Sequence, residues 1–119
     1  MGRPVVHWEL MSQDPAKVSE FYAKIFDWQV EHVPELNYRL VDTGGEGGIN
    51  GGIAPTDDGN RLAAGVVLYV QADDLAATLA KAESLGAKVV LQPVSVPGGP
   101  TIALFTDPEG RLVGLAKGM

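Results

Sequence analysis

Cysteine is absent from the 119 residues of this chain, and basic residues are scarce. Without cysteine, neither a disulfide framework nor a thiolate-based metal or redox site is available, which fits a cytoplasmic protein. Nine Lys and Arg residues against fifteen Asp and Glu give a formal net charge of −6. Nucleic-acid binding depends on clustered basic side chains that neutralise phosphates, so we expect no nucleic-acid partner.

The chain also lacks a long apolar run. No stretch approaches the ~18 residues that a membrane-spanning helix needs, and no apolar secretory segment precedes the first strand pattern, so we expect no membrane association. The apolar content of 45% and charged content of 20% are ordinary for a folded globular protein. The length predicts one domain with a single substantial core.

The first strand pattern carries two polar side chains suited to chemistry. In the sequence Val5-Val6-His7-Trp8-Glu9-Leu10-Met11, alternation puts His7, Glu9 and Met11 on one face and Val6, Trp8 and Leu10 on the other. This pattern predicts a strand packed against apolar structure behind and open to a pocket in front.

A helix follows this strand. Asp14 is placed to cap it, Pro15 suits its first turn, and an apolar stripe at three/four spacing comprises Val18, Phe21, Tyr22, Ile25 and Phe26. Strands are then predicted at 28–33 and 38–42. The glycine-rich stretch 44–53 lacks the lysine of a phosphate-binding loop, so we interpret it as a mobile loop leading into a strand that a ligand or a neighbouring backbone can approach closely.

The second half begins after a polar connection at 55–60. The run 63–70 predicts a strand buried on both faces. Asp73 or Asp74 caps a second helix with the stripe Leu75, Leu79, Ala82 and Leu85, closed by Gly86. Strands at 88–91, 101–105 and 112–116 follow, the last two joined by a tight turn at 107–110.

The two halves repeat in order. Each reads as strand, helix and three strands, and a shift of 59 residues places Asp14 on Asp73 and Val30 on Val89. We therefore predict an α+β fold of two tandem βαβββ modules whose curled mixed sheets surround a cleft.

Three segments resemble the vicinal oxygen chelate superfamily, which includes glyoxalases, bleomycin-resistance proteins and extradiol dioxygenases. These are His7 ahead of Asp14 and Phe21-Tyr22, the run 69–75, and the hairpin Asp107-Pro108-Glu109-Gly110. The resemblance implies a single glyoxalase-like domain over 1–119, with module one at about 4–56 and module two at about 61–118. It also implies a homodimer, since family members commonly pair modules between chains.

The resemblance also points to four metal-ligand positions. His7 matches the first-strand position. The fifth-strand position falls at Val66 or Val67 and the eighth-strand position at Gly114, while the fourth falls within Asn50-Gly51-Gly52. A divalent metal needs several N or O donors converging on one point, so His7 alone, even with Glu9, predicts no intrinsic metal and no cofactor.

Two functions remain open. One is a small-molecule-binding protein without a metal, of the bleomycin-resistance kind, which sequesters a cationic or aromatic ligand. The other is an enzyme, either a lyase or isomerase that uses His7 and Glu9 as an acid–base couple or a metal-dependent glyoxalase-like enzyme. An apolar pocket with a few polar anchors is typical of ligand sites, and the expected wall comprises His7, Glu9, Met11, Val67, Tyr69, Ala103, Phe105, Trp28 and Tyr38.

Overall fold

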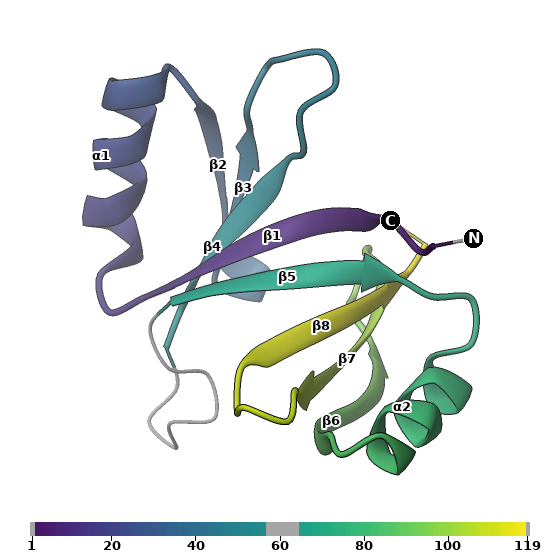
Figure 1. The fold of residues 1–119 in the computed structure, drawn as a ribbon. Helices are drawn as coiled ribbons and strands as arrows, with labels where there is room; N and C mark the ends of the chain where they lie inside the picture. Colours follow the sequence, from purple (N-terminus) through teal and green to yellow (C-terminus); the bar gives the residue numbers. More distant parts are fainter. Residues whose placement is uncertain (1, 57–64, 119) are drawn as a thin grey trace. The chain divides into compact units, whose positions relative to one another are not determined.

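The computed structural model describes residues 2–56 and 65–118, which form two compact units. The N-terminal unit is His7–Val67, and the C-terminal unit is Leu68–Met119 together with Met1–Val6. Figure 1 shows that each unit has its own helix and its own set of neighbouring strands.

In the N-terminal half, four strands pair in the order β2-β3-β4-β1. β1 is parallel to β4, whereas β2–β3 and β3–β4 are antiparallel. The elements in chain order are β1 (Val5–Ser12), α1 (Pro15–Phe26), β2 (Gln29–Val33), a 3-10 turn (Pro34–Leu36), β3 (Tyr38–Asp42) and β4 (Gly51–Pro55).

The C-terminal half repeats this arrangement. Its strands pair in the order β5-β8-β7-β6, with β5 parallel to β8 and the other pairs antiparallel. The elements are β5 (Gly65–Gln71), α2 (Leu75–Ser84), β6 (Lys88–Ser95), β7 (Thr101–Thr106) and β8 (Leu112–Lys117). The predicted tandem βαβββ order is confirmed, and β6 extends four residues beyond its predicted end at 91.

Both helices begin where the sequence predicts. The Asp14 carboxylate accepts a hydrogen bond from the Lys17 backbone N–H at 3.2 Å, and Asp74, rather than Asp73, accepts one from the Ala77 N–H at 3.0 Å. These bonds satisfy backbone donors that a helix start leaves without partners. In the parts of the chain that the structure describes, neither helix is long and apolar enough to cross a membrane.

The two helices bury their apolar stripes to different degrees. Leu75 and Leu79 of α2 pack with Ala72, Ala103 and Leu115 in the core of the C-terminal unit. In α1, by contrast, more than half of the Phe21, Ile25 and Phe26 side chains is exposed. The predicted stripe of α1 is therefore only partly covered. Its aromatic contacts gather at its C-terminal end, where Tyr22 stacks on Trp28 with ring centroids 5.5 Å apart.

Glycines in the last strand of each half allow aromatic rings to lie against the backbone. Trp8 on β1 faces Gly51 on β4, and Tyr69 on β5 faces Gly114 on β8. In both pairs a Cβ atom added to the glycine would overlap the ring. The group that approaches the strand of the glycine-rich stretch is thus a neighbouring aromatic side chain, where the sequence predicted a ligand or backbone.

The strand at β5 differs from its prediction. Val67 and Tyr69 are buried, but Val66 and Leu68 are 62% and 50% exposed, so the two faces alternate instead of both being buried. Predicted features at 57–64, which include most of the polar connection and the first two residues of the predicted strand, lie outside the described residues.

Candidate functional site

The polar face of β1 is turned away from α1. On the opposite face, the Trp8 ring lies 5.3 Å from that of Trp28, which in turn stacks on Tyr22 of α1. Because side chains alternate along a strand, His7 and Glu9 lie on the face that α1 does not cover. The first strand therefore presents an imidazole and a carboxylate on one face, as its sequence predicts.

Tyr38 connects these two side chains. Its hydroxyl lies 2.8 Å from Nε2 of His7 and donates a hydrogen bond of 2.9 Å to Oε1 of Glu9. The ring centroids of His7 and Tyr38 are 6.4 Å apart, with an interplanar angle of 25°. The imidazole and the carboxylate are thus linked through a phenol, in a chain that we call the His7–Tyr38–Glu9 relay.

The strand order explains how Tyr38 reaches β1. β4 lies between β3 and β1, and the registers place Leu40, Gly52 and Glu9 in one row across the three strands. A Cβ atom at Gly52 would collide with the hydroxyl and the ring of Tyr38. The absence of a side chain at Gly52 therefore leaves room for the tyrosine to cross β4.

Burial affects the imidazole directly. His7 is 7% exposed, whereas Glu9 and Tyr38 are half-buried. Burial disfavours the charged imidazolium and so lowers the pKa of His7 below its ordinary value. A neutral imidazole near pH 7 is suited to proton transfer and hydrogen bonding.

The remaining predicted wall residues are distributed over both units. Met11 is buried at 4% exposure near the end of β1. Trp28 belongs to the aromatic cluster beside α1, and Val67 is buried in β5. Tyr69 packs on Gly114. Ala103 and Phe105 lie in or against the core that α2 covers, so the structure gives these two a packing environment where the sequence predicted a ligand wall.

The donor set does not fit the metal that the family resemblance implies. Within residues 2–56 and 65–118, no group of three or more His, Cys, Asp or Glu side chains is placed to hold an ion. Within the fourth-strand range Asn50-Gly51-Gly52, Gly51 lies under the Trp8 ring and Gly52 under the Tyr38 hydroxyl, and the eighth-strand position Gly114 lies under the Tyr69 ring. Aromatic groups thus occupy the space that ligand side chains at these two positions would need.

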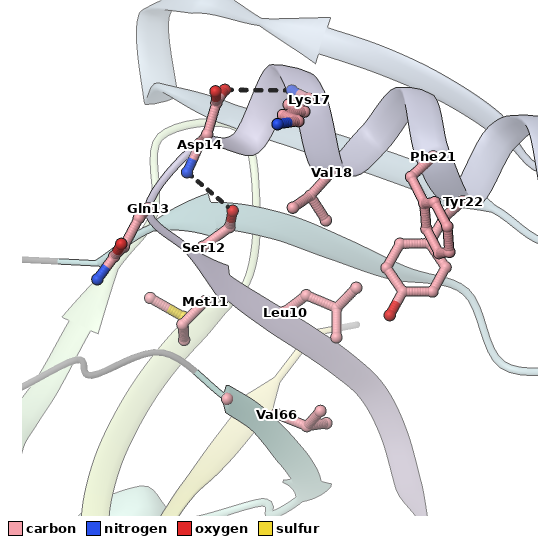
Figure 2. Close-up of a pocket in the computed structure, with 11 residues that line it drawn as sticks. Leu10, Met11, Ser12, Gln13, Asp14, Lys17, Val18, Phe21, Tyr22 and Val66 are labelled. Atoms are coloured by element: carbon pink, nitrogen blue, oxygen red, sulfur yellow. Dashed lines mark hydrogen bonds between the residues drawn. The ribbon is translucent and has the colours of Figure 1, made fainter.

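A separate hollow of about 680 Å³ lies beside α1 in the N-terminal unit. Figure 2 shows that Phe21, Tyr22 and Val18 of α1 line it together with Leu10 and Met11 of β1. Ser12 accepts a hydrogen bond from the Asp14 backbone N–H at 3.0 Å at its polar end. Of the predicted site residues, only Met11 borders this hollow, which does not include the relay.

The sequence alone did not identify the central role of Tyr38. It suggested Tyr38 only as a wall residue. The contact with His7 was not predicted, because the two residues are 31 positions apart in the sequence. The sequence signal that could have indicated such a contact is the pair of glycines at 51 and 52, because glycine within a strand often marks a place where another group packs closely on the backbone. One of them accommodates Trp8 and the other Tyr38.

Comparison with known proteins identifies the family. Residues 5–115 match the model of the glyoxalase/bleomycin resistance protein/dioxygenase superfamily. Proteins of Mycobacterium bovis and Mycobacterium tuberculosis named "Putative glyoxylase CFP32" are 27% identical over 114 residues, which is 92% of this chain. The chain spans only 42% of the length of these relatives.

Solved structures agree on the fold. Methylmalonyl-CoA epimerase from Mycobacterium tuberculosis is 19% identical, with a TM-score of 0.68 over 99% of this chain and 88% of that one. A glyoxalase/bleomycin resistance protein/dioxygenase superfamily member from Vibrio splendidus is 15% identical, with a TM-score of 0.66 over 97% and 98% of the two chains. With the family model covering nearly its whole length, this chain belongs to the glyoxalase/bleomycin resistance protein/dioxygenase superfamily.

Proposed function

We propose that this protein binds a small molecule, without an intrinsic metal, on the sheet face that carries the His7–Tyr38–Glu9 relay. The observation that carries the proposal is the relay itself. It sets three hydrogen-bonding groups of different chemistry in fixed positions on the face away from α1. A few polar anchors of this kind in a surrounding of apolar groups are typical of ligand sites.

The charges on this face favour a cationic ligand. Alternation and strand register place Glu31 of β2 and Asp42 of β3 on the same face as Glu9. They place no Lys or Arg there among the described residues of the N-terminal unit, since Lys17 and Lys24 belong to α1 and Arg39 alternates to the other face. An amine or an aromatic cation is therefore the ligand class that we expect, and sequestration of the bleomycin-resistance type is the role.

A thermal-shift screen of the full chain tests this proposal. The screen compares amines and aromatic cations with carboxylates and phosphates of similar size. A cation at a hundredfold excess over Kd should stabilise the protein by about 2.7 kcal/mol. Glu9→Gln should reduce the shift, whereas Glu35→Gln, in the turn before β3, should leave it unchanged. Equal shifts for cations and anions would contradict the proposal.

An isomerase or lyase is the second candidate function. The relay supports it, because a neutral imidazole held by a phenol and a carboxylate is suited to moving a proton. A ligand found in the screen that carries an acidic C–H bond would exchange that hydrogen for deuterium in heavy water in the presence of the protein. Exchange that persists unchanged in His7→Ala would exclude this function.

The proposal also includes a homodimer, which the family resemblance supports, and a cytoplasmic location, with which the absence of cysteine is consistent. The exposed Phe21, Ile25 and Phe26 of α1 are an apolar surface that such a dimer could cover. Ile25→Asp should then shift light scattering from dimer to monomer, and a monomeric parent protein at micromolar concentration would refute the dimer.

A further inference from the structure

The donors and acceptors of the relay determine where its protons lie. A carboxylate only accepts hydrogen bonds, and a phenol has a single proton to donate. Tyr38 donates that proton to Oε1 of Glu9. The contact of 2.8 Å between Tyr38 Oη and His7 Nε2 then requires that Nε2 donates and the phenol oxygen accepts.

We propose that Tyr38 and Glu9 are positioning residues that hold a proton on Nε2 of His7 and thereby fix the imidazole as its Nε2–H tautomer. The lone pair of the neutral ring then belongs to Nδ1. The inference rests on the proposed function only where it assigns the relay to the ligand site. The proton order, meaning which atoms of the relay carry the protons, is derived from the two hydrogen bonds of Tyr38 alone.

The proton order has two consequences for the site. Because Nε2 already carries a proton, a proton that the neutral imidazole takes up forms its N–H bond at Nδ1, while the bonding electron pair stays on the proton donor and Nε2–H continues to donate to Tyr38. In addition, Nε2 is a donor in this tautomer and offers no lone pair to a metal ion.

The chain is well suited to a direct test, because it contains only two histidines. His7 is 7% exposed and bonded to Tyr38, whereas His32 lies exposed on β2 and serves as an internal control. Two-bond proton–nitrogen correlation spectra of the 15N-labelled full chain distinguish the protonated ring nitrogen from the bare one. We expect His7 to show a proton on Nε2 that exchanges slowly with water, and His32 to show fast exchange.

Two substitutions separate positioning from mere packing. Tyr38→Phe keeps the ring and removes the hydroxyl, so the Nε2 proton should exchange on the order of tenfold faster. In Glu9→Gln the side-chain amide can donate as well as accept, so the order is no longer forced and His7 should show a mixture of both tautomers. Glu35→Gln should leave the His7 resonances unchanged.

A proton on Nδ1 in the parent protein would overturn the inference, as would a His7 spectrum unaffected by Tyr38→Phe in a folded variant. Far-UV circular dichroism establishes folding of each variant. The experiment contains no ligand, so failure of the thermal-shift screen leaves the proton order standing. Conversely, a cation that binds normally to a protein with His7 protonated on Nδ1 would retain the proposed function and refute the tautomer.

Discussion

Gly52→Ala tests the geometry on which the relay depends. The added methyl group would lie well inside van der Waals contact of the Tyr38 hydroxyl and ring, so the tyrosine must move. The hydroxyl then loses its bonds of 2.8 Å to His7 and 2.9 Å to Glu9. Both partners are removed from bulk water to some extent, since His7 is 7% exposed and Glu9 half-buried.

The magnitude follows from these lost contacts. A net hydrogen bond contributes about 0.5–1.5 kcal/mol, and one to a charged group about 1.5–3 kcal/mol. Replacing a strand glycine with alanine also stabilises the folded protein by about 0.4–1 kcal/mol, because alanine lowers the conformational entropy of the unfolded chain. We therefore expect Gly52→Ala to lower the free energy of unfolding by about 1–4 kcal/mol.

Urea unfolding followed by tryptophan fluorescence measures this change. Gly45→Ala is the matched control, because nothing lies within 4 Å of a Cβ atom at that position and its φ is not in the left-handed region. The same substitution at Gly52 in a Tyr38→Ala background removes the obstacle, so its cost should fall below about 0.5 kcal/mol. An equal cost of Gly52→Ala in the two backgrounds would refute the reasoning.

The other predictions concern pH, the second module and its helix. Burial lowers the pKa of His7, so the unfolded chain binds more protons below about pH 6.5 and the free energy of unfolding falls as pH drops, by at most about 1.4 kcal/mol per pH unit. The difference between the parent and His7→Gln from pH 7.5 to 5.5 measures this, and parallel curves would contradict it. Gly114→Ala should destabilise the protein in urea by about 1–3 kcal/mol, because its methyl group would overlap the Tyr69 ring, and wild-type stability would contradict that packing. Asp74→Ala should cost about 1 kcal/mol through loss of the bond to the Ala77 N–H, whereas Asp73→Ala, one residue earlier, should cost less than half of that.

The local elements were predictable because their causes lie close together in sequence. Asp14 and Pro15 begin α1, and the Asp107–Gly110 turn closes through a backbone hydrogen bond of 2.8 Å. Interactions over three or four residues decide such features, so a single sequence contains them. The repeated order of strands and helices was readable for the same reason.

Long-range contacts limited the site prediction. Alternation placed His7 and Glu9 on one face of β1, and the structure agrees. It also placed Ala103 and Phe105 on a ligand wall, but they pack in the core with α2, because which face a helix covers depends on the tertiary arrangement. The exposure of Phe21 and Ile25 is a similar case, since the apolar stripe of α1 does not specify how much of it the sheet covers.

The sequence by itself determined the family, the doubled βαβββ order and the polar face of the first strand, since these follow from residue spacing and the alternation of side chains. Only the tertiary structure decided that Tyr38 joins His7 to Glu9. That connection needs β3 to lie two strands from β1 and Gly52 to leave the intervening strand without a side chain. Strand pairing across 31 residues of chain brings the three groups together, and no local pattern specifies it.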